Sequence, residues 1–229
     1  MKDVLGTAIA DFYFQDSRAC LWVHDHHGPE VEMQIPVYFR HPSSMPELEQ
    51  IALSECRGKV LDIGAGAGSH ALTLQQAGFD VTALDISPKA AEVMRSRGVE
   101  KVVAADIFTF QEERFDTLLL LMNGIGLVGN LDGLRRFLVH AKSLLNPSGQ
   151  LIFDSSDVAY LYEDGPPEKE SYYGEIICRY EYKRKKTDWF SWLYIDEQTL
   201  TGLATAEGWT ITKLFEDEDD QYLVRLQPH

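Results

Sequence analysis

The fold is decided by residues 59–70, which read KVLDIGAGAGSH. The apolar residues 60–63 predict a buried strand, and the apolar spacing from Ala71 to Ala77 predicts a helix that stops at Gly78. The turn between them contains three glycines. Glycine lets the backbone approach a ligand closely at the N-terminus of a helix, where free N–H groups point outward. We therefore expect this turn to bind a nucleotide-like ligand.

The unit of strand, turn and helix recurs along the chain. A helix is expected from Pro88 to Gly98, with Ser87 as its N-cap, and another before the turn at residues 146–149. Further strands are predicted at residues 81–84, 102–104, 115–122, 151–153, 209–215 and 222–226. The central strands do not alternate polar and apolar residues, which is typical of parallel strands covered on both faces. The prediction is a doubly wound, Rossmann-like α/β fold with a mostly parallel seven-stranded sheet and helices on both faces.

Two segments stand outside this pattern. Residues 1–57 combine strand-like pieces with a helical stretch from about Pro46, and we interpret them as an N-terminal extension or lid. They precede a domain of residues 58–229. Within that domain, residues 155–195 are predicted to form a loop and a β-hairpin insertion with the basic turn 183–186. We expect these segments to supply the contacts to a substrate, and their aromatic content suggests a small amphipathic molecule.

The charge of the chain restricts its partners. The 229 residues carry a net charge of −15, and the sequence pI is about 4.8. Because each phosphate contact needs a cation, this charge argues against nucleic acid or an anionic membrane and favours a small or cationic substrate. Three scattered cysteines favour a reducing cytoplasm over a disulfide framework. The sequence shows neither a signal peptide nor an apolar run long enough to span a bilayer.

Three aspartates stand at the ends of three successive predicted strands. Asp62 stands two residues before Gly64, where a carboxylate disfavours a pyrophosphate and favours a cation such as an α-ammonium group. Asp85 ends the second strand, where a carboxylate can accept hydrogen bonds from ribose hydroxyls. Asp106 follows the third strand and suits an adenine amino group. Together these residues predict a site for adenosine and an ammonium group.

Residues 59–154, about 40% of the chain, resemble the class I S-adenosylmethionine-dependent methyltransferases. The resemblance is carried, in order, by VLDIGAGAGSHAL, ALDISPKA, AADIF and LLNPSGQLIF. The family commonly has two glycines where Ser148 and Gly149 stand here. The resemblance is specific for the fold and for the cofactor S-adenosyl-L-methionine, with S-adenosyl-L-homocysteine as product, and it does not identify the substrate.

The resemblance also implies which residues bind the cofactor. In the family the glycine turn passes under the methionine moiety, the second acid binds ribose, the third strand end flanks adenine, and the end of the fourth strand borders the reactive methyl group. Together with Asp62, which the charge argument assigns, the expected cofactor-binding residues are Gly64, Ala65, Gly66, Asp85, Ile86, Asp106, Ile107, Met122 and Asn123.

Four residues are candidates for contacts with the substrate. Tyr38 and Arg40 precede the first motif where family members often close over the methionine end, and an arginine can pair with a carboxylate. Tyr160 belongs to the loop after the fifth strand. Asn123 is followed by Gly124 and not by the Pro-Pro-aromatic signature of nucleic-acid amine methyltransferases.

The sequence therefore predicts an enzyme that transfers the sulfonium methyl group to a small-molecule acceptor by in-line displacement. Two alternatives stay open, namely aminopropyl transfer on the same fold and a cofactor-binding scaffold without activity. We expect no metal, since His24, Asp25, His26 and His27 are more typical of an exposed turn. His70 is either a base near the cofactor, a helix-capping residue or an exposed side chain. The catalytic residues, the acceptor atom and the oligomeric state do not follow from the sequence.

Overall fold

The computed structural model describes residues 2–16, 18–162 and 171–229. Part of the predicted loop, residues 163–170, lies outside the described residues. The chain forms two compact units. The first consists of residues 1–45, 62–109 and 177–190, and the second of residues 46–61, 110–176 and 191–229.

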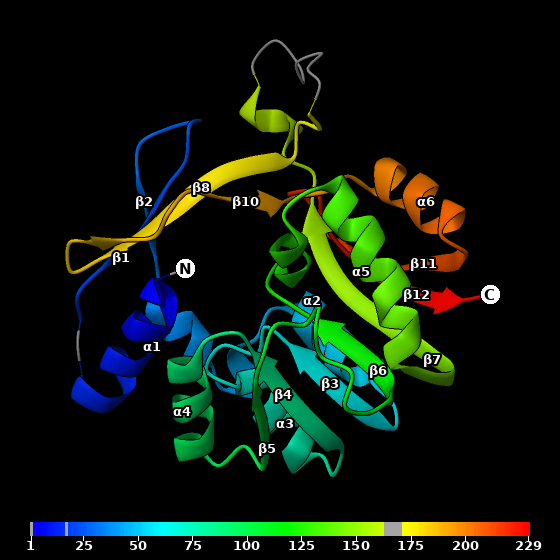
Figure 1. The fold of residues 1–229 in the computed structure, drawn as a ribbon, viewed down its shortest axis with the longest axis horizontal. Coiled ribbons are helices and arrows are strands. Elements are labelled where there is room, and N and C mark those ends of the chain that lie inside the picture. The colour runs from blue at the N-terminus through cyan, green and yellow to red at the C-terminus, as the bar shows by residue number, and fades with distance from the viewer. Residues whose placement is uncertain (1, 17, 163–170) are drawn as a thin grey trace. The chain divides into compact units, whose positions relative to one another are not determined.

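The larger sheet has seven strands in the order β11-β12-β7-β6-β3-β4-β5. β4 is parallel to β5 and β6 is parallel to β7, whereas β12 is antiparallel to both of its neighbours. The strands are Lys59–Ile63 (β3), Asp80–Asp85 (β4), Lys101–Ala104 (β5), Phe115–Leu120 (β6), Leu145–Ser156 (β7), Trp209–Glu216 (β11) and Gln221–Pro228 (β12). The prediction of a mostly parallel seven-stranded sheet is confirmed, and Figure 1 shows β6 beside β7.

Helices connect these strands as the sequence predicts. The α-helices are Val4–Gln15 (α1), Glu47–Ser54 (α2), Ser69–Gln76 (α3), Pro88–Arg97 (α4), Leu131–Leu144 (α5) and Glu197–Ala206 (α6). Short 3-10 helices are Ile35–Phe39 (η1), Pro42–Ser44 (η2), Gly124–Val128 (η3) and Ala159–Leu161 (η4). The Ser87 hydroxyl caps α4 by accepting the Ala90 N–H at 3.0 Å, and Gly98 ends it with φ 95°. A side-chain acceptor satisfies one of the free N–H groups of the first turn, so this cap fixes the start of the helix.

Helix α1 is a feature that the sequence analysis does not predict. Its N-cap, Asp3, accepts the Gly6 N–H at 2.9 Å. Its buried residues Val4 and Ala8 are one helical turn apart, and α1 packs beside α4 (Figure 1). Acids interrupt the apolar run of this segment, and such a pattern is compatible with an amphipathic helix that buries only one face.

A smaller antiparallel sheet joins the predicted hairpin to the N-terminal strands. Its strands run in the order β10-β8-β1-β2, with β9 paired to β8. They are Leu21–His24 (β1), Val31–Met33 (β2), Glu175–Tyr182 (β8), Lys185–Lys186 (β9) and Phe190–Leu193 (β10). Lys183 and Arg184 form a tight turn with φ values of 47° and 62°, so the basic stretch shapes the hairpin tip. The sequence predicts these strands separately and gives no sign that they share a sheet.

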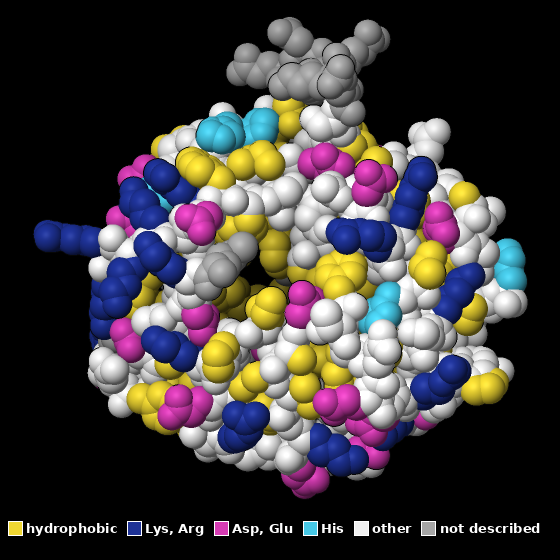
Figure 2. Space-filling model, viewed as in Figure 1, with side chains coloured by type: hydrophobic (Ala, Val, Ile, Leu, Met, Phe, Trp, Pro, Cys, Tyr) yellow, Lys and Arg dark blue, Asp and Glu magenta, His cyan; other side chains and the backbone are white. Residues whose placement is uncertain are grey.

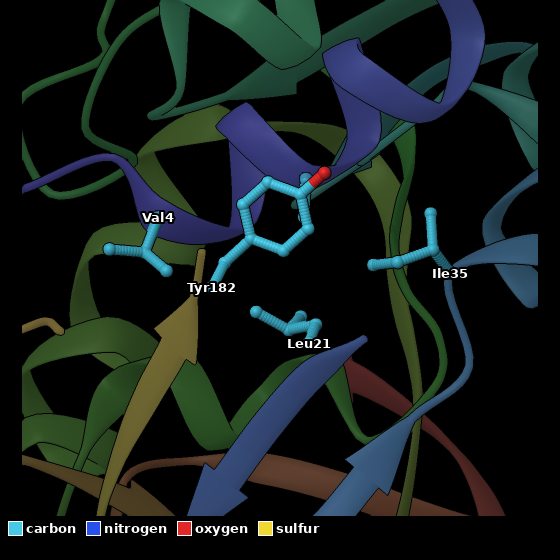
Figure 3. Close-up of a cluster of buried hydrophobic side chains, with 5 residues drawn as sticks. Val4, Leu21, Ile35 and Tyr182 are labelled. Carbon is cyan, nitrogen blue, oxygen red and sulfur yellow. The ribbon is translucent and has the colours of Figure 1, made fainter. Parts of the chain in front are cut away.

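A core cluster in the first unit explains how these strands are held. Val4, Leu21, Ile35 and Tyr182 face one another in Figure 3, and each is at most 6% exposed. They come from α1, β1, η1 and β8. Apolar burial of this kind contributes about 25 cal/mol for each square ångström removed from water, so the cluster fixes the N-terminal segment onto the hairpin.

In the second unit, α5 buries the face that the sequence predicts. Leu134, Phe137 and Leu138 are each 0% exposed. The strand predicted for residues 115–122 ends earlier, at Leu120, because Met122 adopts a left-handed conformation with φ 62°. A residue at such a φ cannot continue a strand.

The surface carries a mixture of side-chain types. Figure 2 shows acidic, basic and apolar side chains intermixed on the face in view. In the described parts of the chain, no helix is both long enough and apolar enough to cross a bilayer.

Replacing Leu21 with alanine tests the core cluster. Leu21 is fully buried, so Leu21→Ala should lower the free energy of unfolding by about 2–5 kcal/mol. Val31 is 61% exposed in the neighbouring strand, and Val31→Ala is the matched control with an expected loss of at most about 1 kcal/mol. Urea denaturation followed by tryptophan fluorescence measures both. Equal losses would contradict the assignment of Leu21 to the core.

Candidate functional site

The turn after β3 is built from glycines in the left-handed region. Gly64, Gly66 and Gly68 have φ values of 72°, 56° and 82°. The N–H groups of Gly64 and Ala65 both donate to the carbonyl of Leu84, at 2.8 and 3.1 Å. Glycine adopts these dihedral angles without the strain that a side chain adds. The turn is therefore anchored on β4 while α3 begins directly after it.

Gly66 lies at the point where the turn meets the N-terminal segment. A Cβ atom on Gly66 would stand 3.0 Å from the ring of Tyr38. The Ser69 hydroxyl donates to the Tyr38 carbonyl at 2.7 Å, which holds this tyrosine against the turn. Tyr38, a candidate from the sequence, thus packs on the glycine turn.

Asp62 is an ionisable group with an unsatisfied oxygen. Asp62 is 2% exposed, and its Oδ2 atom is buried without a hydrogen-bond partner among the described residues. Burial raises the pKa of Asp62, while His70 and the Ala71 N–H act in the opposite direction. His70 is only 7% exposed, so the interpretation of an exposed histidine is wrong. A buried carboxylate oxygen without a donor fits a ligand that brings an ammonium group.

Asp85 connects the turn to the start of α4. Its two oxygens accept the Gly66 N–H at 2.9 Å and the Ser87 N–H at 2.8 Å. Burial raises the pKa of Asp85 to about 6 in spite of these donors. The Ser87 hydroxyl in turn donates to Asp3 at 2.7 Å, so the N-cap of α1 is hydrogen-bonded to the N-cap of α4. This link is not evident from the sequence, because Asp3 is 84 residues away from Ser87.

The residues predicted to flank adenine differ in their exposure. Ile86 is 71% exposed and Ile107 is 4% exposed. Asp106 is exposed, and one of its oxygens accepts the Phe108 N–H at 2.9 Å. The Ala105 N–H donates to the Asp85 carbonyl at 3.0 Å. A flat ring that packs on Ile86 would cover its exposed apolar side chain, and adenine offers such a ring.

The second unit contains a further acid at a strand end, which the sequence analysis does not single out. Asp154, near the end of β7, is 0% exposed, and its Oδ2 accepts the Asn123 N–H and the Gln221 side chain, both at 2.9 Å. Its Oδ1 atom is buried without a hydrogen-bond partner in the part of the chain that the structure describes. Met122 and Asn123 have φ values of 62° and 53°. The signal for Asp154 was available, because it follows an apolar strand just as Asp85 does.

Comparison with known proteins identifies the chain. Residues 61–153 match the family profile of the methyltransferase domain. A solved structure of an S-adenosylmethionine-dependent methyltransferase from Bacteroides fragilis, in complex with S-adenosyl-L-homocysteine, is 43% identical. The match has a TM-score of 0.91 and covers 98% of this chain and 94% of that one. The chain belongs to the S-adenosylmethionine-dependent methyltransferase family.

Curated relatives of this methyltransferase match only in part. Glycine/sarcosine N-methyltransferase of Halorhodospira halochloris is 33% identical over 132 residues, which are 53% of this chain and 49% of that protein. Demethylmenaquinone methyltransferase of Tropheryma whipplei (strain Twist) is 30% identical over 100 residues, 41% and 40% of the two chains. The methyltransferase chain thus spans about half the length of the curated relatives it matches or less.

The other substrate candidates of the methyltransferase lie in different surroundings. Arg40 is partly buried, directly after η1. Tyr160 lies in η4 and is 77% exposed. The Asn123 side chain donates to the Leu193 carbonyl at 3.3 Å. Tyr38 and Arg40 therefore belong to the first unit, and Tyr160 and Asn123 to the second.

Two histidines from the predicted exposed turn contact other side chains. His24 is 2.9 Å from Glu181, and His26 stacks on Trp189 with ring centroids 4.6 Å apart. In the part of the chain that the structure describes, no three His, Cys, Asp or Glu side chains converge as a metal site requires.

Replacing Gly66 tests the geometry of the turn. Gly66→Ala should lower the free energy of unfolding by about 1–3 kcal/mol, because φ 56° disfavours a side chain and Tyr38 leaves little room for a Cβ atom. Gly202 in α6 is exposed with open space around it, so Gly202→Ala should instead stabilise the protein by about 0.5–1 kcal/mol. Chemical denaturation measures both changes. A shift of the same sign and size in the two variants would contradict this account.

Proposed function

We propose that this methyltransferase transfers a methyl group from S-adenosylmethionine to a small-molecule acceptor and releases S-adenosylhomocysteine. The observation that carries the proposal is the buried Oδ2 atom of Asp62, which has no hydrogen-bond partner among the described residues and lies next to a glycine turn that is hydrogen-bonded to Asp85. The complex of the Bacteroides fragilis relative with S-adenosyl-L-homocysteine, at 43% identity, supports the same cofactor.

The first unit would bind most of the cofactor. Asp62 would accept the α-ammonium group, with Gly64, Ala65 and Gly66 beneath the methionine chain. Asp85 would accept the ribose hydroxyls in addition to its two backbone donors. In the same proposal the adenine ring lies against Ile86 and Ile107, and Asp106 pairs with its amino group. Each of these contacts uses an atom type that the residue can offer.

The family resemblance assigns Met122 and Asn123 to the methyl end of the cofactor. When bound, the cofactor supplies a sulfonium carbon that is already electrophilic. The protein then has to align the acceptor in line with that carbon, exclude water and, for a protonated acceptor, remove a proton. We assign this alignment of the acceptor to two segments. One is residues 1–57, as the N-terminal extension or lid of a domain of residues 58–229. The other is residues 155–195 within that domain. Tyr38, Arg40, Asn123 and Tyr160 are the substrate contacts proposed within them.

The proposed acceptor is a small molecule and not a nucleic acid, because the net charge of −15 opposes the binding of phosphate backbones. The proposed compartment is the cytoplasm, since Cys20, Cys56 and Cys178 are free thiols.

Calorimetric titration tests the cofactor on protein stripped of carried-over ligand. S-adenosylmethionine and S-adenosylhomocysteine should bind with micromolar affinity, and NAD should not bind. Absence of binding by the first two would remove the basis for methyl transfer. Binding without turnover over a broad panel of acceptors would favour a non-catalytic scaffold, and turnover with a polyamine acceptor and decarboxylated cofactor would favour aminopropyl transfer.

The two ends of β4 provide a matched pair of variants for the ribose contact. Asp85→Asn should weaken S-adenosylhomocysteine binding at least about tenfold, since a charge-assisted hydrogen bond is worth about 1.5–3 kcal/mol. Asp80 lies at the other end of the strand and pairs with Lys101 on the surface, so Asp80→Asn should leave the affinity unchanged. Wild-type affinity in Asp85→Asn would contradict the assignment of this residue.

A further inference from the structure

Among the described residues of the second unit, two buried side-chain oxygen atoms have no hydrogen-bond donor. They are Oδ1 of Asp154 and Oδ1 of Asn123. The two residues are directly connected, because the Asn123 N–H donates to the other oxygen of Asp154 at 2.9 Å. A buried acceptor without a donor costs about 1–3 kcal/mol. Two such acceptors on hydrogen-bonded neighbours indicate a place for a group that brings its own donors.

The orientation of the Asn123 amide is fixed by its surroundings. Its nitrogen donates to the Leu193 carbonyl at 3.3 Å. A flipped amide would place two acceptor oxygens against each other, so the carbonyl oxygen is the atom without a partner. The site therefore offers one carboxylate oxygen and one amide oxygen, both of which accept hydrogen bonds.

The number of acceptors distinguishes between classes of methyl acceptor. A hydroxyl or thiol has a single hydrogen to donate and can satisfy one of the two oxygens. A primary amine or ammonium group has at least two hydrogens and can satisfy both. An amine therefore matches the donor requirement of the site more completely.

The negative charge of the site also favours an amine. Asp154 is 0% exposed, and Glu49 of α2, which is 4% exposed, adds negative potential at its carboxylate. Burial, followed by the effect of Glu49, raises the pKa of Asp154 to about 6, although the Asn123 N–H and Gln221 lower it. A carboxylate with a pKa near neutrality can hold an ammonium group and also accept its proton.

We propose that the acceptor is a small amine, whose nitrogen is bound by Oδ1 of Asp154 and Oδ1 of Asn123 and whose proton is taken by Asp154. This inference rests on the proposed function, which supplies the sulfonium methyl group. An ammonium acceptor first gives one proton to the Asp154 carboxylate, which becomes a carboxylic acid. The freed nitrogen lone pair forms the bond to the methyl carbon, the carbon–sulfur bond breaks, and its electron pair stays on sulfur. The products are a methylated ammonium ion, a neutral thioether and a proton on Asp154 that returns to water.

The experiment begins with S-adenosylhomocysteine binding to the full-length wild-type protein, which tests the cofactor separately. Release of S-adenosylhomocysteine is then measured with matched panels of small amines, amino acids, alcohols, phenols and thiols. Amines alone should turn over. If the cofactor product binds but an alcohol, a phenol or a thiol is methylated in preference, or no amine is methylated, the inference is overturned while the cofactor assignment stands.

Asp154→Asn separates proton acceptance from support of the turn. An asparagine can still accept the Asn123 N–H through its carbonyl, so the turn is retained and affinity for S-adenosylhomocysteine should stay within about twofold. The kcat/KM for the amine should fall at least about 100-fold, a typical contribution of a positioned base. The acidic limb of its pH profile should move from near pH 6 to the pKa of the free amine. If kcat/KM and the acidic limb of the pH profile are both unchanged in Asp154→Asn, Asp154 has only a structural role.

Two further variants complete the test. Asn123→Gly removes the amide but tolerates the left-handed conformation, so KM for the amine should rise about tenfold with the acidic limb kept near pH 6. Asp116→Asn is the matched control, because this acid lies near the start of β6 and accepts the Lys59 N–H and the Asn146 amide. It should leave kcat, KM and the pH profile unchanged. A tenfold rise in KM in the control would contradict a specific role for the Asp154 site.

Discussion

The burial of carboxylates at the ends of parallel strands is the constraint on which the rest of the structure depends. Asp62, Asp85 and Asp154 lie at or near the carboxyl ends of β3, β4 and β7, and burial raises the pKa of each. An ionised carboxylate in such surroundings is costly unless donors surround it. Backbone N–H groups from Gly66, Ser87 and Asn123 are among these donors. The need to bring backbone donors to these acids explains why tight, left-handed turns follow the strands.

The N-terminal segment is part of the same arrangement. Asp3 caps α1 and also accepts the Ser87 hydroxyl, while Ser87 donates to Asp85 through its backbone. Tyr38 packs on Gly66, and its carbonyl accepts the Ser69 hydroxyl. Displacement of this segment would leave Ser87 without one partner and would open the turn on the side of Tyr38. The segment therefore contributes to the geometry of the glycine turn.

The sequence predicts the parts of the fold that repeat and misses those that depend on long-range contacts. The β3 turn, the Ser87 cap and the Gly98 stop follow from local residue chemistry, and the seven-stranded sheet follows from their repetition. Helix α1 is missed because acids interrupt its apolar residues, and it becomes evident only when α4 covers its buried face. The small sheet is missed because β1 pairs with β8, which lies more than 150 residues away in the chain. Spacing places Asp62 and Asp85, but the unpartnered oxygens of Asp62 and Asp154 are visible only in three dimensions.

Support of the turn at Met122 and Asn123 does not by itself account for an ionisable residue at position 154. Two consecutive non-glycine residues in the left-handed region store about 1–3 kcal/mol each. One oxygen of Asp154 secures this turn by accepting the Asn123 N–H and the Gln221 amide. A neutral asparagine could accept the same two hydrogen bonds without the desolvation cost of a buried charge. The second carboxylate oxygen adds this cost and finds no hydrogen-bond partner among the described residues, which is the reason for proposing a ligand that donates hydrogen bonds and releases a proton.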